Sequence, residues 1–180
     1  MCPHVPTVFR DETAVLGWGE VRSVQTLTAP GVRFSPDRRR VLEAGLDYFA
    51  FLNRLAMPFL GVRFAAGGAA VVRLFGITLL SFRAPEIRAE PGCAVVRYPI
   101  AAGLLVHRRM RGHGELRLEM HADRLVMAVE GYVPALAGRG GSRLRRRLYE
   151  GTQAAVHRRV AARYLGEWLA RLLAEQDPQP

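Results

Sequence analysis

The chain has 180 residues, of which 49% are hydrophobic and 23% charged, and its formal net charge is +10 at pH 7. This length and balance suit one globular domain with a core of ordinary size, and they exclude a disordered or collagen-like chain. All 26 basic residues are arginine. Such a bias is typical of a GC-rich coding sequence, so arginine content alone does not predict phosphate binding. The net charge would still attract acidic partners in a salt-dependent way.

The sequence predicts neither export nor insertion into a membrane. The first ten residues contain two prolines instead of the basic start and apolar run of a signal peptide. The most apolar region, residues 55–82, is interrupted by proline, glycine and arginine, whereas a spanning helix needs roughly 18–20 apolar residues in a row. Cys2 and Cys93 have neither a disulfide-framework nor a metal-motif spacing. We therefore expect a cytoplasmic protein with reduced cysteines.

The first elements are expected to be an arm, a strand and a helix. Residues 1–17 lack periodicity and predict an irregular amino-terminal arm, whereas residues 18–28 alternate in character and predict the first strand. The Ser-Pro-Asp sequence at 35–37 predicts a helix start, with serine as the N-cap and proline in the first turn. The helix should run to about Met57, because Pro58 stops it. Its apolar residues cover most of its circumference, so it should be largely buried.

Strands are expected to follow this helix. Residues 69–82 are rich in valine, leucine, isoleucine and phenylalanine, with Gly76 as a bend or bulge. Residues 86–89 and 93–98 are two further strands, joined by a Glu-Pro-Gly turn. Pro99 should interrupt the second of them.

Two further turns predict the register of the next strands. A hairpin tip at residues 111–112 would bring His107 into the sheet, and a second tip at residues 122–123 would set Leu118 opposite Met127. Because side chains alternate across a sheet, these two assumptions assign every position to a face.

One predicted face of this sheet is dry and the other is wet. The dry face collects Leu105, His107, Leu116, Leu118, Met120, Leu125, Met127 and Val129. The wet face collects Arg108, Glu115, Arg117, Glu119 and Glu130. Antiparallel sheets are commonly two-faced in this way, so helices must cover the dry side.

The last third of the chain predicts a long helix. Residues 142–175 contain no proline and recurring apolar positions, so they form one long helix or two short ones. The apolar stripe changes sides after Val160, which predicts either a kink near Ala161 or a straight helix buried on different sides along its length. Residues 18–175 then make a single α+β domain, and residues 176–180 are a disordered tail.

The order of these elements resembles the helix-grip fold of the START and polyketide-cyclase-like superfamily. The resemblance covers roughly Trp18 to Glu175 and is one of topology, without a signature motif. It implies a curved antiparallel sheet of about six to seven strands packed against a long C-terminal helix, with a helical segment after the first strand. It also implies a cavity between sheet and helix for an apolar or amphipathic small molecule, either lipid-like or aromatic.

Seven side chains are candidates for lining such a cavity. They are His107, Tyr132, His157, Tyr164, Trp168, Met120 and Met127. His157, Tyr164 and Trp168 share one helix face, because residues three, four and seven apart lie together. Their polar atoms could orient a ligand, although ordinary half-buried packing accounts for the same pattern. A desolvated His107 with a tyrosine partner is the basis of a further hypothesis, a cyclase-like or hydrolase-like enzyme.

A second functional class follows from an arginine cluster that comes after a glycine-rich segment. The cluster consists of Arg143, Arg145, Arg146 and Arg147. At a helix start these side chains could bind phosphates or an acidic membrane surface, giving an adaptor instead of a ligand carrier. A solvated helix face is the alternative. Nucleic acid is not an expected partner, because the aromatic residues fall mostly in the predicted core.

No cofactor and no metal site are predicted. His113 and His121 lie at opposite ends of one predicted strand, too far apart to share an ion with His107. Haem binding by His157 would rest on a single histidine, which has almost no specificity. Cys93 begins a strand and is expected to be a small buried side chain.

Overall fold

The computed structural model describes residues 5–16, 20–55, 59–107, 111–133 and 155–176. The elements in these ranges are β1 (Val8–Val15), β2 (Val21–Thr28), α1 (Arg38–Leu55), β3 (Leu60–Phe64), the 3-10 turn η1 (Ala66–Gly68), β4 (Ala70–Leu74), β5 (Ile77–Phe82), β6 (Glu86–Glu90), β7 (Cys93–Ala102), β8 (Gly114–His121), β9 (Arg124–Tyr132) and α3 (Ala155–Gln176). The described chain is therefore of the expected α+β class.

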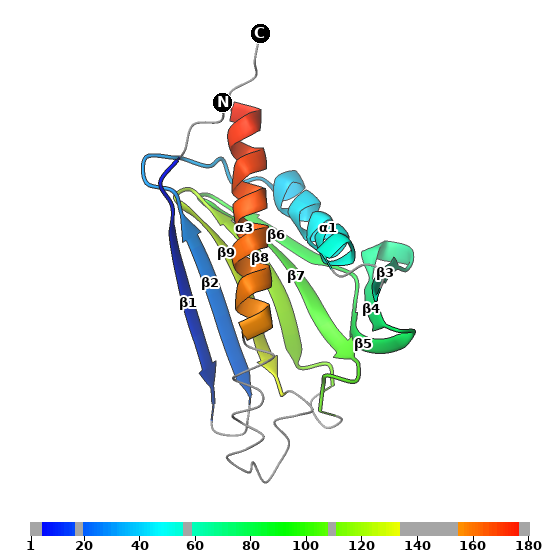
Figure 1. Ribbon diagram of the computed structural model, residues 1–180. Helices are drawn as coiled ribbons and strands as arrows, with labels where there is room; N and C mark the ends of the chain where they lie inside the picture. The colour runs from blue at the N-terminus through cyan, green and yellow to red at the C-terminus, as the bar shows by residue number, and fades with distance from the viewer. Residues whose placement is uncertain (1–4, 17–19, 56–58, 108–110, 134–154, 177–180) are drawn as a thin grey trace.

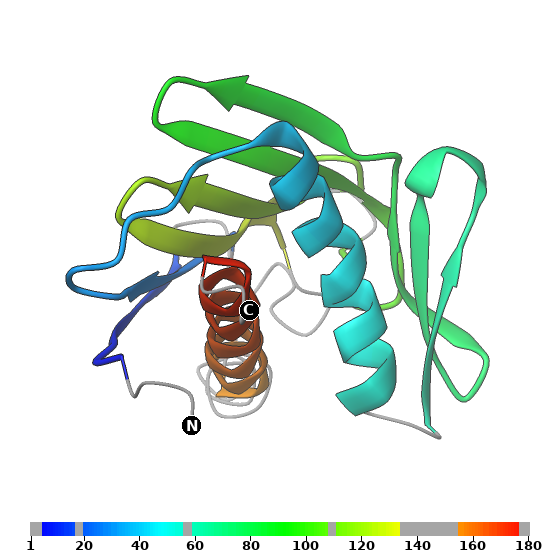
Figure 2. The same cartoon turned by 90° about the horizontal axis from the view of Figure 1, so that it is seen from above.

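The strands form one antiparallel sheet in the order β1-β2-β9-β8-β7-β5-β4-β3, with β6 pairing separately with β7. Both described helices lie on the same face of this sheet (Figure 1). Seen along α3, the sheet bends around the two helices (Figure 2). We call the face under the helices the inner face and the opposite one the outer face. The described sheet has nine strands, more than the six to seven expected from the sequence.

The prediction of an irregular arm is wrong for residues 8–15, which form β1. This strand pairs along its whole length with β2, from Val8 opposite Thr28 to Val15 opposite Val21. Most of its side chains are exposed, because β1 is an edge strand. An edge strand has no need for the strict alternation that marks a half-buried one. Its sequence therefore carries little periodic signal.

The N-cap of helix α1 lies two residues later than expected. The Asp37 carboxylate accepts a hydrogen bond from the backbone N–H of Arg39 (3.3 Å), and its carbonyl accepts the first helical bond, from Val41 N (3.1 Å). Asp37 is thus the N-cap in place of Ser35. The helix is buried on one side only, with Leu46 38% and Leu55 39% exposed.

A glycine lets α1 approach the sheet closely. A Cβ on Gly45 would lie 2.6 Å from the Tyr98 Oη and 2.8 Å from its ring. Tyr98 lies on the inner face of β7 with no exposed surface. Burial raises the pKa of its phenol to about 12. Glycine has no Cβ, and its presence at position 45 therefore allows α1 to pack directly over the Tyr98 ring.

Pro99 does not interrupt β7, contrary to expectation. On one side β7 pairs with β6 up to Arg97, and it resumes pairing with β5 at Ile100. Pro99 falls in the gap between these two partner strands, where neither strand pairs with it, so the missing backbone N–H of proline costs no hydrogen bond. Its carbonyl accepts a bond from Arg83 N (2.9 Å).

The glycine expected to bend one strand lies in a turn between two. Phe75 (φ +48°) and Gly76 (φ +81°) connect β4 to β5. Positive φ at both central residues is typical of the tight type I′ hairpin, and it is unfavourable for a phenylalanine. The Glu-Pro-Gly turn between β6 and β7 is confirmed.

One of the two predicted registers is confirmed. Leu118 lies opposite Met127 across the turn at residues 122–123. The tip at residues 111–112 is wrong, because β8 pairs with the earlier residues of β7, with Tyr98 opposite Leu116. The predicted dry side chains of β8 and β9 point inward, and the charged ones point outward. The buried inward set is Leu116, Leu118, Met120, Leu125 and Met127.

Helix α3 is one element from residue 155 to residue 176, without a break at Ala161. Its buried residues form one continuous stripe: Ala161, Tyr164, Leu165, Trp168, Leu169 and Leu172. Val156, expected in the first stripe, is 59% exposed. The predicted kink and change of side are therefore wrong for the described part of this helix. No helix among the described residues has the length and apolar character needed to cross a membrane.

Candidate functional site

Four of the predicted ligand-binding residues lie in the packed core. Met120, Met127 and Tyr164 have no exposed surface, and Trp168 is 3% exposed. A void large enough for water would leave accessible surface on its lining, so these side chains adjoin no such void. Tyr164 packs against Tyr48 (ring centroids 5.1 Å apart) and donates a hydrogen bond to the Ala44 carbonyl.

The remaining predicted residues are scattered. His107 lies outside the strands, half-buried, with its backbone N–H bonded to the Val133 carbonyl (2.8 Å). It is therefore not on the dry face of the sheet, where the sequence placed it. Tyr132 ends β9. The cluster of Arg143, Arg145, Arg146 and Arg147 is outside the described residues.

Polar side chains gather on the inner face of β1 and β2, among otherwise apolar neighbours. Gln25 has no exposed surface and Ser23 is 3% exposed. Gln25 Nε2 donates to Asp11 Oδ1 (2.6 Å) and to Ser23 Oγ (2.7 Å). Thr13 Oγ1 donates to Asp11 Oδ1 (2.9 Å) and lies 2.8 Å from Ser23 Oγ. We call Asp11, Thr13, Ser23 and Gln25 the inner polar cluster.

The direction of each hydrogen bond in the inner polar cluster can be assigned. Thr13 uses its only hydroxyl proton on Asp11, so the Ser23 hydroxyl donates to Thr13 and accepts from Gln25. The chain of donors ends at one carboxylate oxygen. Gln25 Oε1 is left buried without a hydrogen-bond partner. A buried amide oxygen without a partner costs on the order of 1–3 kcal/mol.

His157 of α3, whose imidazole is within electrostatic range of Asp11, adds a second unpartnered atom. Its Nε2 is buried and makes no hydrogen bond. Burial lowers the pKa of His157 to about 4, and the negative charge of Asp11 opposes that shift. The imidazole is therefore neutral at pH 7, with one nitrogen as donor and the other as acceptor. The Asp11 carboxylate thus interacts electrostatically with His157 and also accepts a hydrogen bond from Gln25.

The inner polar cluster and His157 together could hold an uncharged polar group. Gln25 Oε1 can only accept, whereas neutral His157 can donate or accept according to its tautomer. A hydroxyl does both. An anion would be repelled by Asp11, and no basic side chain among the described residues forms an ion pair with this carboxylate. The hydroxyl protons of Thr13 and Ser23 are used within the cluster, and His157 Nε2 accepts neither of them.

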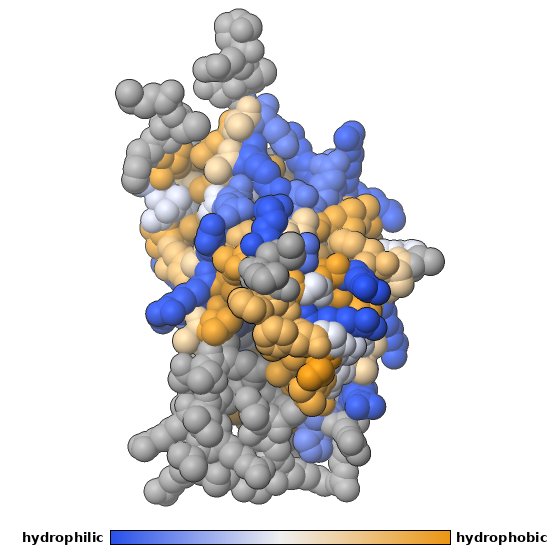
Figure 3. Space-filling model, turned by 45° about the vertical axis from the view of Figure 1, so that its right-hand side comes forward, coloured by the Kyte–Doolittle hydropathy of each residue, from blue (hydrophilic) through white to orange (hydrophobic). Residues whose placement is uncertain are grey.

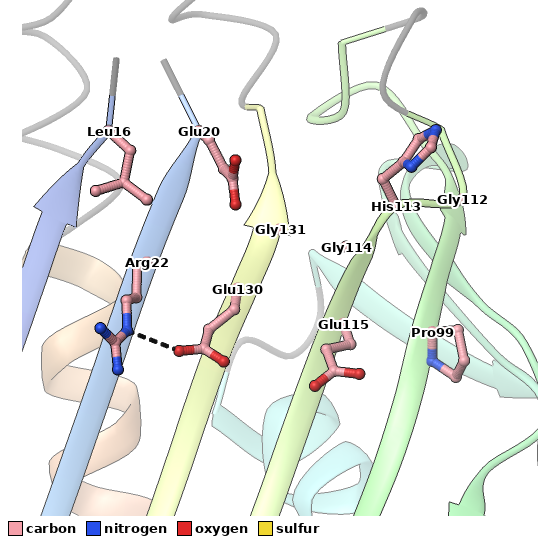
Figure 4. Close-up of a pocket in the computed structure, with 10 residues that line it drawn as sticks. All are labelled: Leu16, Glu20, Arg22, Pro99, Gly112, His113, Gly114, Glu115, Glu130 and Gly131. Atoms are coloured by element: carbon pink, nitrogen blue, oxygen red, sulfur yellow. Dashed lines mark hydrogen bonds and ion pairs between the residues drawn. The ribbon is translucent and has the colours of Figure 1, made fainter. Parts of the chain in front are cut away.

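A surface hollow lies on the outer face of the sheet, at the end of the strands opposite the β6–β7 turn. Figure 4 shows the residues that line it. It has a volume of 390 Å³. Its lining consists of Leu16, Glu20, Arg22, Pro99, Gly112, His113, Gly114, Glu115, Glu130 and Gly131. Arg22 Nε pairs with Glu130 Oε1 (2.9 Å) across it. Arg22 and Glu130 are thus already paired there, whereas Gln25 Oε1 and His157 Nε2 on the inner face have no hydrogen-bond partner.

A third set of reactive side chains lies at the β6–β7 end of the outer face. Cys93, Glu119 and His121 have ligand atoms within 4.8 Å of one another. Burial raises the pKa of the Cys93 thiol, and the charges of Glu119 and Glu90 add to this effect. The thiol is therefore protonated at neutral pH and a poor nucleophile. The expectation that no metal site exists was drawn from the spacing of the histidines and of the two cysteines, and it did not consider Cys93, Glu119 and His121 together.

The sequence missed both groups because both depend on pairing between strands. Asp11 and Thr13 lie in the segment expected to be irregular, and only the β1–β2 register brings them to Gln25. Cys93 meets His121 only in the actual β7–β8 register. The usable signal was the alternation of Ser23 and Gln25 with apolar residues in β2, since polar residues recurring on a buried face need partners.

The chain matches no protein-family model, and no curated protein or solved structure is significantly similar to it.

Proposed function

We propose that the protein binds an amphipathic small molecule between the sheet and α3, with the polar end of the ligand at the inner polar cluster. The observation that carries this proposal is the pair of buried, unpartnered atoms beside Asp11, namely Gln25 Oε1 and His157 Nε2. Buried polar atoms are nearly always satisfied in folded proteins. A hydroxyl group of a ligand would satisfy both.

The arrangement of elements supports the same proposal. A final helix lying along the inner face of a bent antiparallel sheet is the layout of a helix-grip protein, and we propose that class for this chain. In this scheme the ligand occupies the half of the inner face near His157. The other half, around Met127 and Trp168, is closed by packing.

The chemistry of the cluster favours a neutral alcohol or phenol over a fatty acid. A carboxylate would lie next to the Asp11 carboxylate, and like charges at short range repel each other. Decanol and decanoate, which differ only in this group, are suitable probes. We expect decanol to bind the purified protein in calorimetry and decanoate to bind at least about tenfold more weakly.

Gln25→Met tests the role of the amide group, because methionine keeps the length of the side chain and removes the free acceptor together with the bonds from Nε2 to Asp11 and Ser23. We expect about a tenfold loss of decanol affinity, since one hydrogen bond is lost. His121→Gln, on the outer face, is the control and should leave decanol binding unchanged. Absence of decanol binding to the native protein, or equal binding by Gln25→Met, would contradict the proposal. A water molecule would then be the partner of both atoms.

A second candidate function, attachment to an acidic lipid surface, is favoured by a separate observation. Phe59 and Phe75 are 55% and 72% exposed, with ring centroids 5.3 Å apart. Beside them a hollow of 230 Å³ is lined also by Arg63 and Arg73. Neither arginine has a carboxylate partner among the described residues. Figure 3 views the molecule from this side, with hydrophobic and hydrophilic areas adjoining.

Exposed aromatic rings beside unpaired guanidinium groups fit the boundary between acyl chains and phosphates. We expect the protein to bind vesicles containing phosphatidylserine and to bind pure phosphatidylcholine far less. Phe75→Ser should weaken this binding by about tenfold, because it removes one buried ring. Val156→Ser replaces an apolar residue of α3 that is 59% exposed and should have no effect. Equal binding to both vesicle types would contradict this function.

A further inference from the structure

The outer face carries a cluster of cysteine, glutamate and histidine that neither proposed function uses. Cys93 is the first residue of β7 and His121 the last of β8, and they are directly opposite each other in the ladder. Glu119 precedes His121 by two residues, so alternation puts its side chain on the same face. Three potential ligands are thus brought to one spot by a single strand pair.

The distances within this cluster are those of a compact coordination site. His121 Nε2 lies 2.6 Å from Glu119 Oε2 and 3.9 Å from Cys93 Sγ. Ligands at about 2.0–2.3 Å from a tetrahedral ion lie roughly 3–4 Å from one another. Small side-chain rotations would therefore bring all three atoms into contact with one ion. The half-buried position would give that ion partial shelter from water.

The surroundings would orient the ligands and leave a position open. Arg117 Nε pairs with Glu119 Oε1 (2.5 Å), which leaves Oε2 directed at His121. Such contacts behind a ligand fix its orientation. On the other side, Glu90 of β6 is directly opposite Cys93, so a further carboxylate borders the cluster. The set therefore provides three ligands, plus a fourth position for water or Glu90.

The ligand types select the ion. Thiolate and imidazole favour zinc and its first-row neighbours, whereas calcium and magnesium prefer oxygen ligands throughout. The simpler alternative is a hydrogen bond between His121 and Glu119, with Cys93 as a bystander. The two alternatives differ in one respect, because only a metal site gives the sulfur of Cys93 a function.

We propose that Cys93, Glu119 and His121 form a binding site for a divalent transition-metal ion of the zinc class. This site is independent of the ligand proposed for the inner face. Cobalt(II) is the appropriate probe, because a thiolate bound to cobalt gives an intense charge-transfer absorption in the near ultraviolet. We expect one equivalent of cobalt to produce this band and one equivalent of zinc to displace it.

The two cysteines of the chain provide a matched pair of variants. Cys93→Ser should abolish the charge-transfer band and weaken zinc binding by at least about tenfold. Mutation of residues that only support a ligand already lowers metal affinity by about this factor, so loss of a ligand should cost at least as much. Cys2→Ser should keep both. Glu119→Gln and His121→Ala should likewise weaken binding, and Cys93→Ser, which is nearly isosteric, remains informative if either fails to fold.

Three results would overturn the proposal. The first is cobalt binding without a charge-transfer band. The second is a band that survives in Cys93→Ser and disappears in Cys2→Ser. The third is zinc affinity that is equal in the native protein and in Cys93→Ser, which would indicate ordinary surface binding by histidine.

Discussion

The two faces of the same sheet treat polar side chains differently. On the inner face, Gln25 and Ser23 form short hydrogen bonds within a cluster around Asp11, and Gln25 Oε1, His157 Nε2 and Tyr98 Oη are buried without hydrogen-bond partners. On the outer face, Arg117 contacts Glu115 (3.3 Å) and Glu130 (3.2 Å) in a half-buried network of ion pairs.

This difference determines which observations carry functional information. Water can satisfy an exposed ion at little cost, so an ionic network on a surface is weak evidence of function. Within a core no such substitute exists, and an unpartnered atom calls for an explanation. The group of Cys93, Glu119 and His121 lies between these extremes, because its residues are half-buried and the proposal of a metal site depends on their combination of ligand types.

The largest effect on stability is expected from a substitution that shortens a buried side chain on the inner face. Met127→Ala should lower the free energy of unfolding by about 2–5 kcal/mol, because it leaves a cavity in a fully buried position. Denaturation by urea at pH 7 measures it. Arg22→Ala, on the outer face, breaks an exposed ion pair and should cost less than about 1 kcal/mol. Similar losses for the two variants would remove the distinction between the faces.

The next effect concerns pH and His157. The pKa of its imidazole is lowered to about 4 in the folded protein, against about 6.5 in the unfolded chain. Between these values the unfolded state binds more protons, so stability falls as the pH is lowered from about 6.5 to about 4. The loss should approach, at most, about 3 kcal/mol. His157→Gln cannot titrate and should lack this part of the pH dependence; an identical profile would contradict the assignment.

A smaller effect tests how closely α1 packs on the inner face. Gly45→Ala should destabilise the protein by about 1–3 kcal/mol, because the added methyl would overlap Tyr98. The opposite is expected for Gly166→Ala, an exposed position in α3 with open space at its Cβ. That change should stabilise the protein by about 0.5–1 kcal/mol, the usual gain for alanine in a helix. Thermal unfolding of both variants measures the contrast.

Sequence reasoning worked where the information was local. The turn at residues 122–123 and the alternation on either side of it predicted that Leu118 meets Met127, which is confirmed. The same reasoning failed at residues 111–112, because β7 continues past Pro99 and pairs earlier in its length. The rule that proline ends a strand does not apply where no neighbour needs its N–H.

The candidate sites could be predicted only in part. His157 was selected from the helical spacing, and the structure gives it a buried unpartnered nitrogen on that helix. Its neighbours Asp11 and Gln25 were not selected, because an edge strand shows little periodicity and pairing between β1 and β2 has no signature in composition. Met120 and Met127 were assigned to the correct face of the sheet, but that face is fully packed around them.

The edge position of β1 has a consequence for dynamics. This strand hydrogen-bonds to β2 alone among the described strands, and most of its side chains face water. Such a strand opens at a lower free energy than the centre of a sheet, so its amides should exchange with deuterium well before those of β8. Because β1 carries Asp11 and Thr13, each opening would expose Gln25 while the rest of the core stays folded. The apparent affinity for any internal ligand would then be the intrinsic affinity multiplied by the fraction of molecules in which β1 is paired.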